Sequence, residues 1–394
     1  MKFFKKDIIF VSLFGLFLGA STTMIYSQLS LFMKHVLHMK VSNIAILDGI
    51  VELISYVTRV FAGVISDSIS NRKIFLLIGS IITLSMKPVF ALAQNAIHIF
   101  IAQSIERIGN GLQASPRDAL VAELSEPSER ATVFGFNKCL KTIGALIGVP
   151  VAVSILYITH NNYRILFALA TVAVAIGIFC LVKTQEKRVV MQKVNHKSIP
   201  SIDNIFKKDY LKLLDTNFWK LIVLATLCEA GHFSEHLLPL YANNFLSETF
   251  AGTTGMFISV GQVLFAIPMG IAADRLGKGR FIIVCIFMMI AANTLFFTAN
   301  SIYYVYCGCV LWGAQITSIQ GLFLSIISEK VPTELRATAI GIYYCSIGAS
   351  YLLASTIAGN LWNSYGCKYV FIYSICMLIS SFLLFPILYS KSKK

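Results

Sequence analysis

Glutamate and histidine side chains cluster in Glu229-Ala-Gly-His232-Phe-Ser-Glu235-His236. If the stretch is one helix, all four fall within an arc of about 120°, so a polar face is predicted to point into a cavity. These residues can exchange protons near neutral pH, which favours proton coupling or contact with a polar ligand. Histidines four apart would also suit a divalent metal, and polar packing is the structural alternative. The H-E-x-x-H protease motif is absent, because Phe233 stands where its glutamate belongs.

Other ionisable residues lie deep inside apolar stretches, where a charge costs at least about 2.5–3.5 kcal/mol and therefore faces a cavity or a partner. Arg107 stays charged at any working pH, so it could anchor an anionic substrate group or pair with an acid such as Glu106 or Glu52. Lys138 and Lys141 share a helix face and could extend this positive site, unless acids neutralise them. The predicted substrate and coupling residues are Tyr26, Asp48, Glu52, Glu106, Arg107, Lys138, Lys141, Glu229, His232, Glu235, His236 and Gln315.

The composition indicates a membrane protein. Of 394 residues, 56% are hydrophobic and only 13% are charged, and the mean hydropathy is +0.73. An average soluble domain carries about 25% charged residues. These values exclude a soluble enzyme, a secreted disulfide scaffold and a disordered chain. The nine cysteines are scattered and are interpreted as small apolar residues.

Twelve apolar runs predict an all-α membrane protein with twelve transmembrane helices, because a spanning helix needs about 20 residues. The first run is too long for a signal peptide and is kept as a helix. The runs are 8–33, 42–65, 74–95, 97–122, 131–158, 164–182, 218–242, 252–273, 281–299, 301–328, 337–361 and 366–390.

Basic residues are distributed unequally between the two sides. The termini and the connections after even-numbered runs hold 22 Lys and Arg, and the opposite connections hold 4. The positive-inside rule therefore places both termini in the cytoplasm, and it accounts for the net charge of +14 without nucleic acid. We expect a six-helix bundle over 1–185, a basic cytoplasmic linker over 186–216 and a second six-helix bundle over 217–394.

The two halves share motifs at almost one offset. Gly63 and Asp67, followed by Arg72 and Lys73, recur 207 residues later as Gly270 and Asp274, followed by Lys278 and Arg280. Arg130-Ala-Thr-Val-Phe-Gly recurs 206 residues later as Arg336-Ala-Thr-Ala-Ile-Gly. Two matches at equivalent positions predict an internal duplication and two pseudo-symmetric bundles. In transporters built this way, the substrate binds near the midplane between the repeats.

The repeated loop resembles the G-x-x-x-D-(R/K)-x-G-(R/K)-(R/K) signature of the major facilitator superfamily. The second copy matches well, whereas the first has Ser68 and Ser70 at the usual Arg and Gly positions. The resemblance implies a cytoplasmic gate formed by residues of both loops and of the repeated helix starts. The alternative is a turn that only sets topology. The gate residues are Gly63, Asp67, Arg72, Arg130, Gly270, Asp274, Arg275 and Arg336.

The fourth run also resembles this superfamily, at Arg107, Asn110, Gly111 and Ala114. It ends in Pro-Arg-Asp-Ala-Leu, at 116–120, which resembles a bacterial and archaeal subgroup. Gly135, Gly144, Gly148 and Pro150 are similar to the glycine signature of antiporters, with the proline one residue late. Subgroup members often carry a Glu where this chain has Thr23 and an Asp where it has Lys141, so its substrate or coupling is expected to differ.

These features predict a secondary active transporter that works by alternating access, not an enzyme. Proton-coupled efflux of a drug-like compound or siderophore is the first hypothesis, and uptake of an organic anion or metabolite is its rival. A non-transporting membrane sensor is the alternative from another class. No G-x-x-x-x-G-K-(S/T) motif exists for ATP binding. We expect no cofactor or bound metal, a small-molecule substrate, lipid contact, a monomer and a multi-pass place in the bacterial cytoplasmic (inner) membrane.

Overall fold

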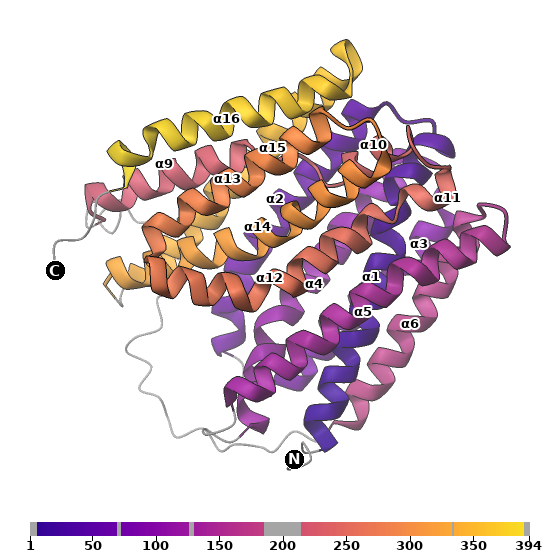
Figure 1. Ribbon diagram of the computed structural model, residues 1–394. Coiled ribbons are helices and arrows are strands. Elements are labelled where there is room, and N and C mark those ends of the chain that lie inside the picture. The colour runs from indigo at the N-terminus through magenta and orange to yellow at the C-terminus, as the bar shows by residue number, and fades with distance from the viewer. Residues whose placement is uncertain (1–5, 69–71, 126–129, 185–213, 333–334, 390–394) are drawn as a thin grey trace. The chain divides into compact units, whose positions relative to one another are not determined.

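The computed structural model describes residues 6–68, 72–125, 130–184, 214–332 and 335–389 (Figure 1). Within these ranges the regular structure is helical and no strand occurs. The helices are α1 Lys6–His35, α2 Val41–Ser68, α3 Arg72–Leu92, α4 Ala96–Leu124, α5 Arg130–Ile158, α6 Tyr163–Lys183, α9 Thr216–Ala230, α10 Leu237–Ala242, α11 Glu248–Ala251, α12 Thr254–Leu276, α13 Lys278–Phe297, α14 Ile302–Lys330, α15 Arg336–Tyr365 and α16 Cys367–Leu388.

Each predicted apolar run corresponds to a long helix, except that the run at 218–242 is divided between α9 and α10. Among the described residues, eight helices are long and apolar enough to cross a membrane. The eight do not include α9, which has only 15 residues, or α4, which carries several charged residues. Twelve spanning helices therefore stay a prediction, and so does the cytoplasmic position of the termini.

The chain divides into two compact units. Unit 1 comprises residues 1–39, 54–192 and 238–259, and unit 2 comprises 40–53, 193–237 and 260–394. Each unit thus includes a short segment from the opposite half of the sequence. The predicted linker boundary at 186–216 stays a prediction, because 185–213 lie outside the described residues.

The two units repeat one packing scheme. In unit 1, α1 packs against α5 and α6, and α3 packs against α4 and α6, as Figure 1 shows for the indigo α1 beside α5. In unit 2, α9 packs against α15 and α16, and α13 packs against α14 and α16. These are the same pairs in chain order, as expected if the sequence repeats are the product of a duplication.

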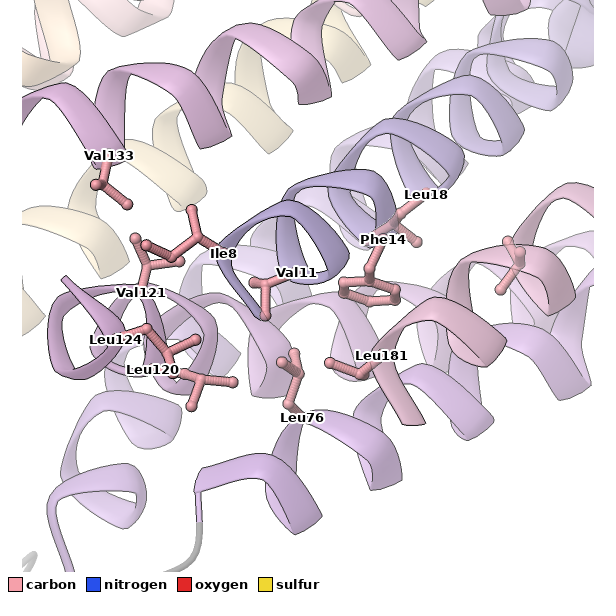
Figure 2. Packing of buried hydrophobic residues seen from close by; sticks show 11 residues of the cluster. Ile8, Val11, Phe14, Leu18, Leu76, Leu120, Val121, Leu124, Val133 and Leu181 are labelled. Carbon is pink, nitrogen blue, oxygen red and sulfur yellow. The ribbon is translucent and has the colours of Figure 1, made fainter. Parts of the chain in front are cut away.

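An apolar cluster joins five helices at one end of unit 1. Figure 2 shows Val11 and Phe14 of α1 beside Leu76 of α3 and Leu181 of α6. Leu120 of α4 lies in the same cluster and is fully buried. Val133 adds α5, so the cluster fixes how α1, α3, α4, α5 and α6 meet.

Small residues allow α1 and α5 to approach closely. A Cβ atom added at Gly144 would collide with the backbone of Leu16, and one added at Gly148 would collide with the backbone of Ala20. In membranes, glycine at such contacts lets helix backbones pack directly against each other. Gly144 and Gly148, two of the glycines that resemble the antiporter signature, are therefore packing residues of unit 1.

Two glycines in left-handed backbone conformations join consecutive helices. Gly277 (φ 85°) connects α12 to α13, and Gly366 (φ 103°) connects α15 to α16. A positive φ costs glycine nothing, because it has no Cβ atom. The glycine of the second signature loop is thus required by its backbone conformation.

Candidate functional site

The predicted seventh helix is interrupted at the polar cluster. Helix α9 ends at Ala230, with Gly231 as its C-cap, and α10 begins only at Leu237. Ser374 of α16 donates a hydrogen bond to the carbonyl oxygen of Gly231, which holds the break against α16. The prediction that Glu229, His232, Glu235 and His236 share one helical face is therefore wrong, because the helix does not continue through them.

Glu229 and His232 form the first acid–imidazole pair of the break. The Nδ1 atom of His232 lies 3.6 Å from Oε2 of Glu229, and its Nε2 atom lies 2.9 Å from Oε1 of Gln315. All three side chains are buried. Trp312 packs edge-on against the imidazole, with 5.8 Å between ring centroids. The imidazole thus lies between a carboxylate and an amide, where its protonation changes both contacts.

Asp48 and His236 form the second pair. Oδ1 of Asp48 lies 3.3 Å from Nε2 of His236. Ser234 donates a 2.7 Å hydrogen bond to Oδ2 of Asp48, and Tyr351 donates a 3.1 Å bond to the same oxygen. Asp48 is only 4% exposed. Since a buried carboxylate needs donors, these three groups explain why Asp48 is tolerated here.

The remaining acids of this region are more accessible. Glu52, one turn beyond Asp48 on α2, is half-buried, and Glu235 is exposed. In the described parts of the chain, no three His, Cys, Asp or Glu side chains are grouped so that they could hold a metal ion. The structure therefore brings Asp48, Glu229, His232, His236 and Gln315 to one break in unit 2.

Unit 1 contains a different charged site. Lys87 of α3 and Glu106 of α4 form an ion pair at 2.7 Å, and both side chains are fully buried. The guanidinium of Arg107 lies 4.9 Å from the centre of the Tyr26 ring, a cation–π contact. Glu106, which was one of the acids considered as a partner of Arg107, therefore pairs with Lys87. Arg107 and Tyr26 are brought together as site residues of unit 1.

The two lysines predicted to extend the positive site lie on the surface of α5. Lys138 and Lys141 are exposed, whereas the neighbouring Asn137 is buried. Their part in an anion site stays a prediction.

Most of the predicted gate residues fall at positions whose surroundings lie outside the described residues. These are Gly63, Asp67, Arg72, Arg130, Gly270, Asp274 and Arg336, whereas Arg275 is exposed. Two basic neighbours are described. Lys73 donates to the carbonyl oxygens of Val182 and Thr184 at the end of α6, and Lys278 contacts Glu329 of α14. Both lysines thus bind within their own half of the sequence.

Four residues outside the predicted set contact predicted site residues. Lys87 pairs with Glu106 in unit 1, whereas Ser234, Trp312 and Tyr351 contact Asp48 or His232 in unit 2. Lys87 carried a signal, since a lysine within an apolar run needs a partner. Ser234 and Tyr351 carried none, because their partner lies on a distant segment of the chain.

Comparison with known proteins agrees with this architecture. The family model described as Major Facilitator Superfamily matches residues 11–245 and 236–394. An uncharacterized MFS-type transporter of Methanocaldococcus jannaschii is 27% identical over 354 residues, which cover 87% of this chain and 85% of that protein. A probable 4-methylmuconolactone transporter of Cupriavidus pinatubonensis is 21% identical, over 83% of this chain and 76% of that one.

Solved structures share the fold. The crystal structure of a mutant nucleoside transporter has a TM-score of 0.83 at 13% identity and covers 98% of this chain and 100% of that chain. That of a D-xylose–proton symporter has a TM-score of 0.76 at 16% identity, with 98% of both chains covered. With its long apolar helices, the chain is a multi-pass integral membrane protein and a transporter. It belongs to the Major Facilitator Superfamily.

Proposed function

We propose that this protein is a proton-coupled secondary transporter that exports a small organic solute by alternating access. The observation that carries the proposal is the presence of two buried carboxyl–imidazole pairs, Glu229–His232 and Asp48–His236, at the break between α9 and α10. A buried pair of this kind is neutral when it holds one proton. Loss of that proton, or binding of a second one, gives the pair a net charge in a low-dielectric layer. Such a charge favours a conformation in which water reaches the pair.

The proposed orientation has both termini in the cytoplasm of a bacterial cell whose inner membrane the helices span. Lys330 at the end of α14 supports it, because lysine and arginine gather on the cytoplasmic side of such proteins. Exposed tyrosines mark the opposite helix ends as a membrane interface, since tyrosine is enriched at both interfaces. Tyr303 and Tyr304 lie at the start of α14, and Tyr365 and Tyr369 lie where α15 meets α16. Export and membership of the Pro-Arg-Asp-Ala-Leu subgroup rest on the sequence motifs alone.

The test is flux through proteoliposomes with an imposed pH gradient and a metabolite panel. Glu229→Gln removes the titratable group but keeps the shape of the side chain. We expect it to abolish proton-driven accumulation and to leave solute counterflow intact, since counterflow requires no net proton movement. The control is Asp215→Asn, which removes an exposed carboxylate just before α9 and should leave accumulation unchanged. Accumulation that is unchanged in Glu229→Gln would assign Glu229 to packing.

Uptake of an organic anion is the second candidate, and Arg107 supports it. The guanidinium is half-buried beside Tyr26, in a layer where its charge would strengthen contact with a carboxylate or phosphate. The same liposomes separate the two candidates. If the protein exports its solute in exchange for protons, solute should accumulate when protons flow in the opposite direction. If it takes up an anion together with protons, solute should accumulate when protons flow in the same direction.

A further inference from the structure

The segment 40–53 belongs to the first half of the sequence but packs within unit 2. We call it the exchanged segment. Gly49 of this segment approaches the backbone of Leu352, and Gly359 of α15 approaches the backbone of Ser42. Asn363 donates a 2.7 Å hydrogen bond to the hydroxyl of Ser42. The exchanged segment is therefore closely packed along α15.

Asp48 lies in the middle of the exchanged segment and is its buried carboxylate. It receives hydrogen bonds from Ser234 and Tyr351 and contacts His236, and all three partners come from the second half of the sequence. Because these contacts are charge-assisted, each is stronger than a neutral hydrogen bond. Asp48 thus makes polar contacts with three side chains from the second half of the sequence.

The proton content of the pair decides whether this contact is stable. With an ionised carboxylate and a protonated imidazole the pair carries no net charge. Loss of the imidazole proton leaves a buried negative charge, and protonation of the carboxylate leaves a buried positive one. Either change weakens the attraction, and water reaches the remaining charge only if the segment separates from the break between α9 and α10.

Other ionisable groups surround the pair. Glu52 lies one turn along α2 from Asp48, and both Glu52 and Glu235 are close enough to Tyr351 to act on it electrostatically. Glu229 lies within electrostatic range of Glu52 and pairs with the imidazole of His232. Four carboxyl groups and two imidazoles thus lie around the break.

We infer that Asp48 and His236 form a proton-binding latch that holds the exchanged segment against the break between α9 and α10 and releases it when the proton content of the pair changes. This inference rests on the proposed function, because it supplies the link between a coupling proton and alternating access. It assigns a role to Ser234 and Tyr351 as well, which hold the carboxylate in position.

Hydrogen–deuterium exchange of the full-length protein in lipid nanodiscs tests the latch without any substrate. Exchange is followed in peptides covering 40–53 between pH 5 and 9 and corrected for the intrinsic pH dependence of amide exchange. We expect the strongest protection at intermediate pH and about tenfold faster opening at both extremes, the change expected for one lost charge-assisted hydrogen bond. Peptides from α13 report whether the fold as a whole is affected.

Three variants make the test specific. Asp48→Asn and His236→Gln should open the segment and remove its pH dependence. Tyr351→Phe removes a donor but no charge, so it should speed opening at every pH and keep the pH dependence. A wild-type protection that is flat with pH, or a pH dependence that survives in Asp48→Asn, would overturn the latch. If the opening of the segment depends on pH but the flux of solute does not depend on the pH gradient, the latch stands and the proposed proton coupling is refuted.

Discussion

Lys87 and Glu106 form an ion pair with 2.7 Å between Nζ and Oε1, and neither side chain is exposed. The pair joins α3 to α4 in unit 1 and satisfies two charges that the apolar layer could not hold singly. It also leaves the adjacent Arg107 beside Tyr26. Glu106, which belongs to a structural ion pair, and Arg107, a candidate ligand-binding cation, are therefore consecutive on α4.

Breaking this pair should destabilise the protein. Lys87→Met and Glu106→Gln each leave one buried charge without its partner, which costs about 3–5 kcal/mol. The double variant Lys87→Met/Glu106→Met removes both charges and should recover most of the loss. Thermal unfolding in detergent measures the effect. A double variant as unstable as the single ones would show that the pair has a further role.

Arg107 should act through its charge and its planar shape. Arg107→Ala is expected to weaken anion transport by about 10- to 100-fold, the value of one or two lost charge-assisted contacts. Arg107→Lys should recover part of the activity, because it restores the charge but not the bidentate geometry. Initial rates in proteoliposomes give the comparison. Tyr26→Phe retains the ring of the cation–π contact and should remain close to wild type; equal losses in all three variants would contradict this assignment.

Close packing of α1 and α5 should make Gly144 intolerant of larger residues. Gly144→Ala places a Cβ atom against the backbone of Leu16, so we expect a loss of about 1–3 kcal/mol from overpacking. Gly321→Ala is the matched control, because its added Cβ meets nothing within 4 Å. In the middle of α14 this change should stabilise the helix by about 0.5–1 kcal/mol. Melting temperatures that shift alike in the two variants would argue against the close contact.

A hydroxyl–carboxylate contact should hold residues 238–259 in unit 1. Tyr163 donates a hydrogen bond to Glu248, and Thr249 donates a 2.8 Å bond to Asn161. Tyr163→Phe should cost about 1.5–3 kcal/mol, the usual contribution of a hydrogen bond to a charged group. Tyr157→Phe is the control, since Tyr157 is 69% exposed. Denaturant unfolding of the two variants decides the matter, and equal stabilities would show that the Glu248 contact contributes little.

Much of the architecture could be predicted from local patterns. Long apolar runs predicted the helices, and the repeated loops at one offset predicted two units with equivalent packing, because both signals are read along the chain without knowing which helices meet. The same patterns identified the superfamily. Glu229, His232 and Gln315 were singled out as site residues, and the structure brings them together.

Contacts between distant segments were decided only by the tertiary structure. Helical periodicity predicted one helical face from Glu229 to His236. However, α9 ends at Ala230, and Ser374 of α16 donates a hydrogen bond to the carbonyl oxygen of the next residue, Gly231. Glu106 could have bound Arg107 or Lys87, and the packing of α3 against α4 selected Lys87. The sequence alone determined which residues are apolar enough to span a membrane and which charges need partners. The partners themselves depended on how helices far apart in the chain pack, because spacing within a helix sets no distance to a residue on another one.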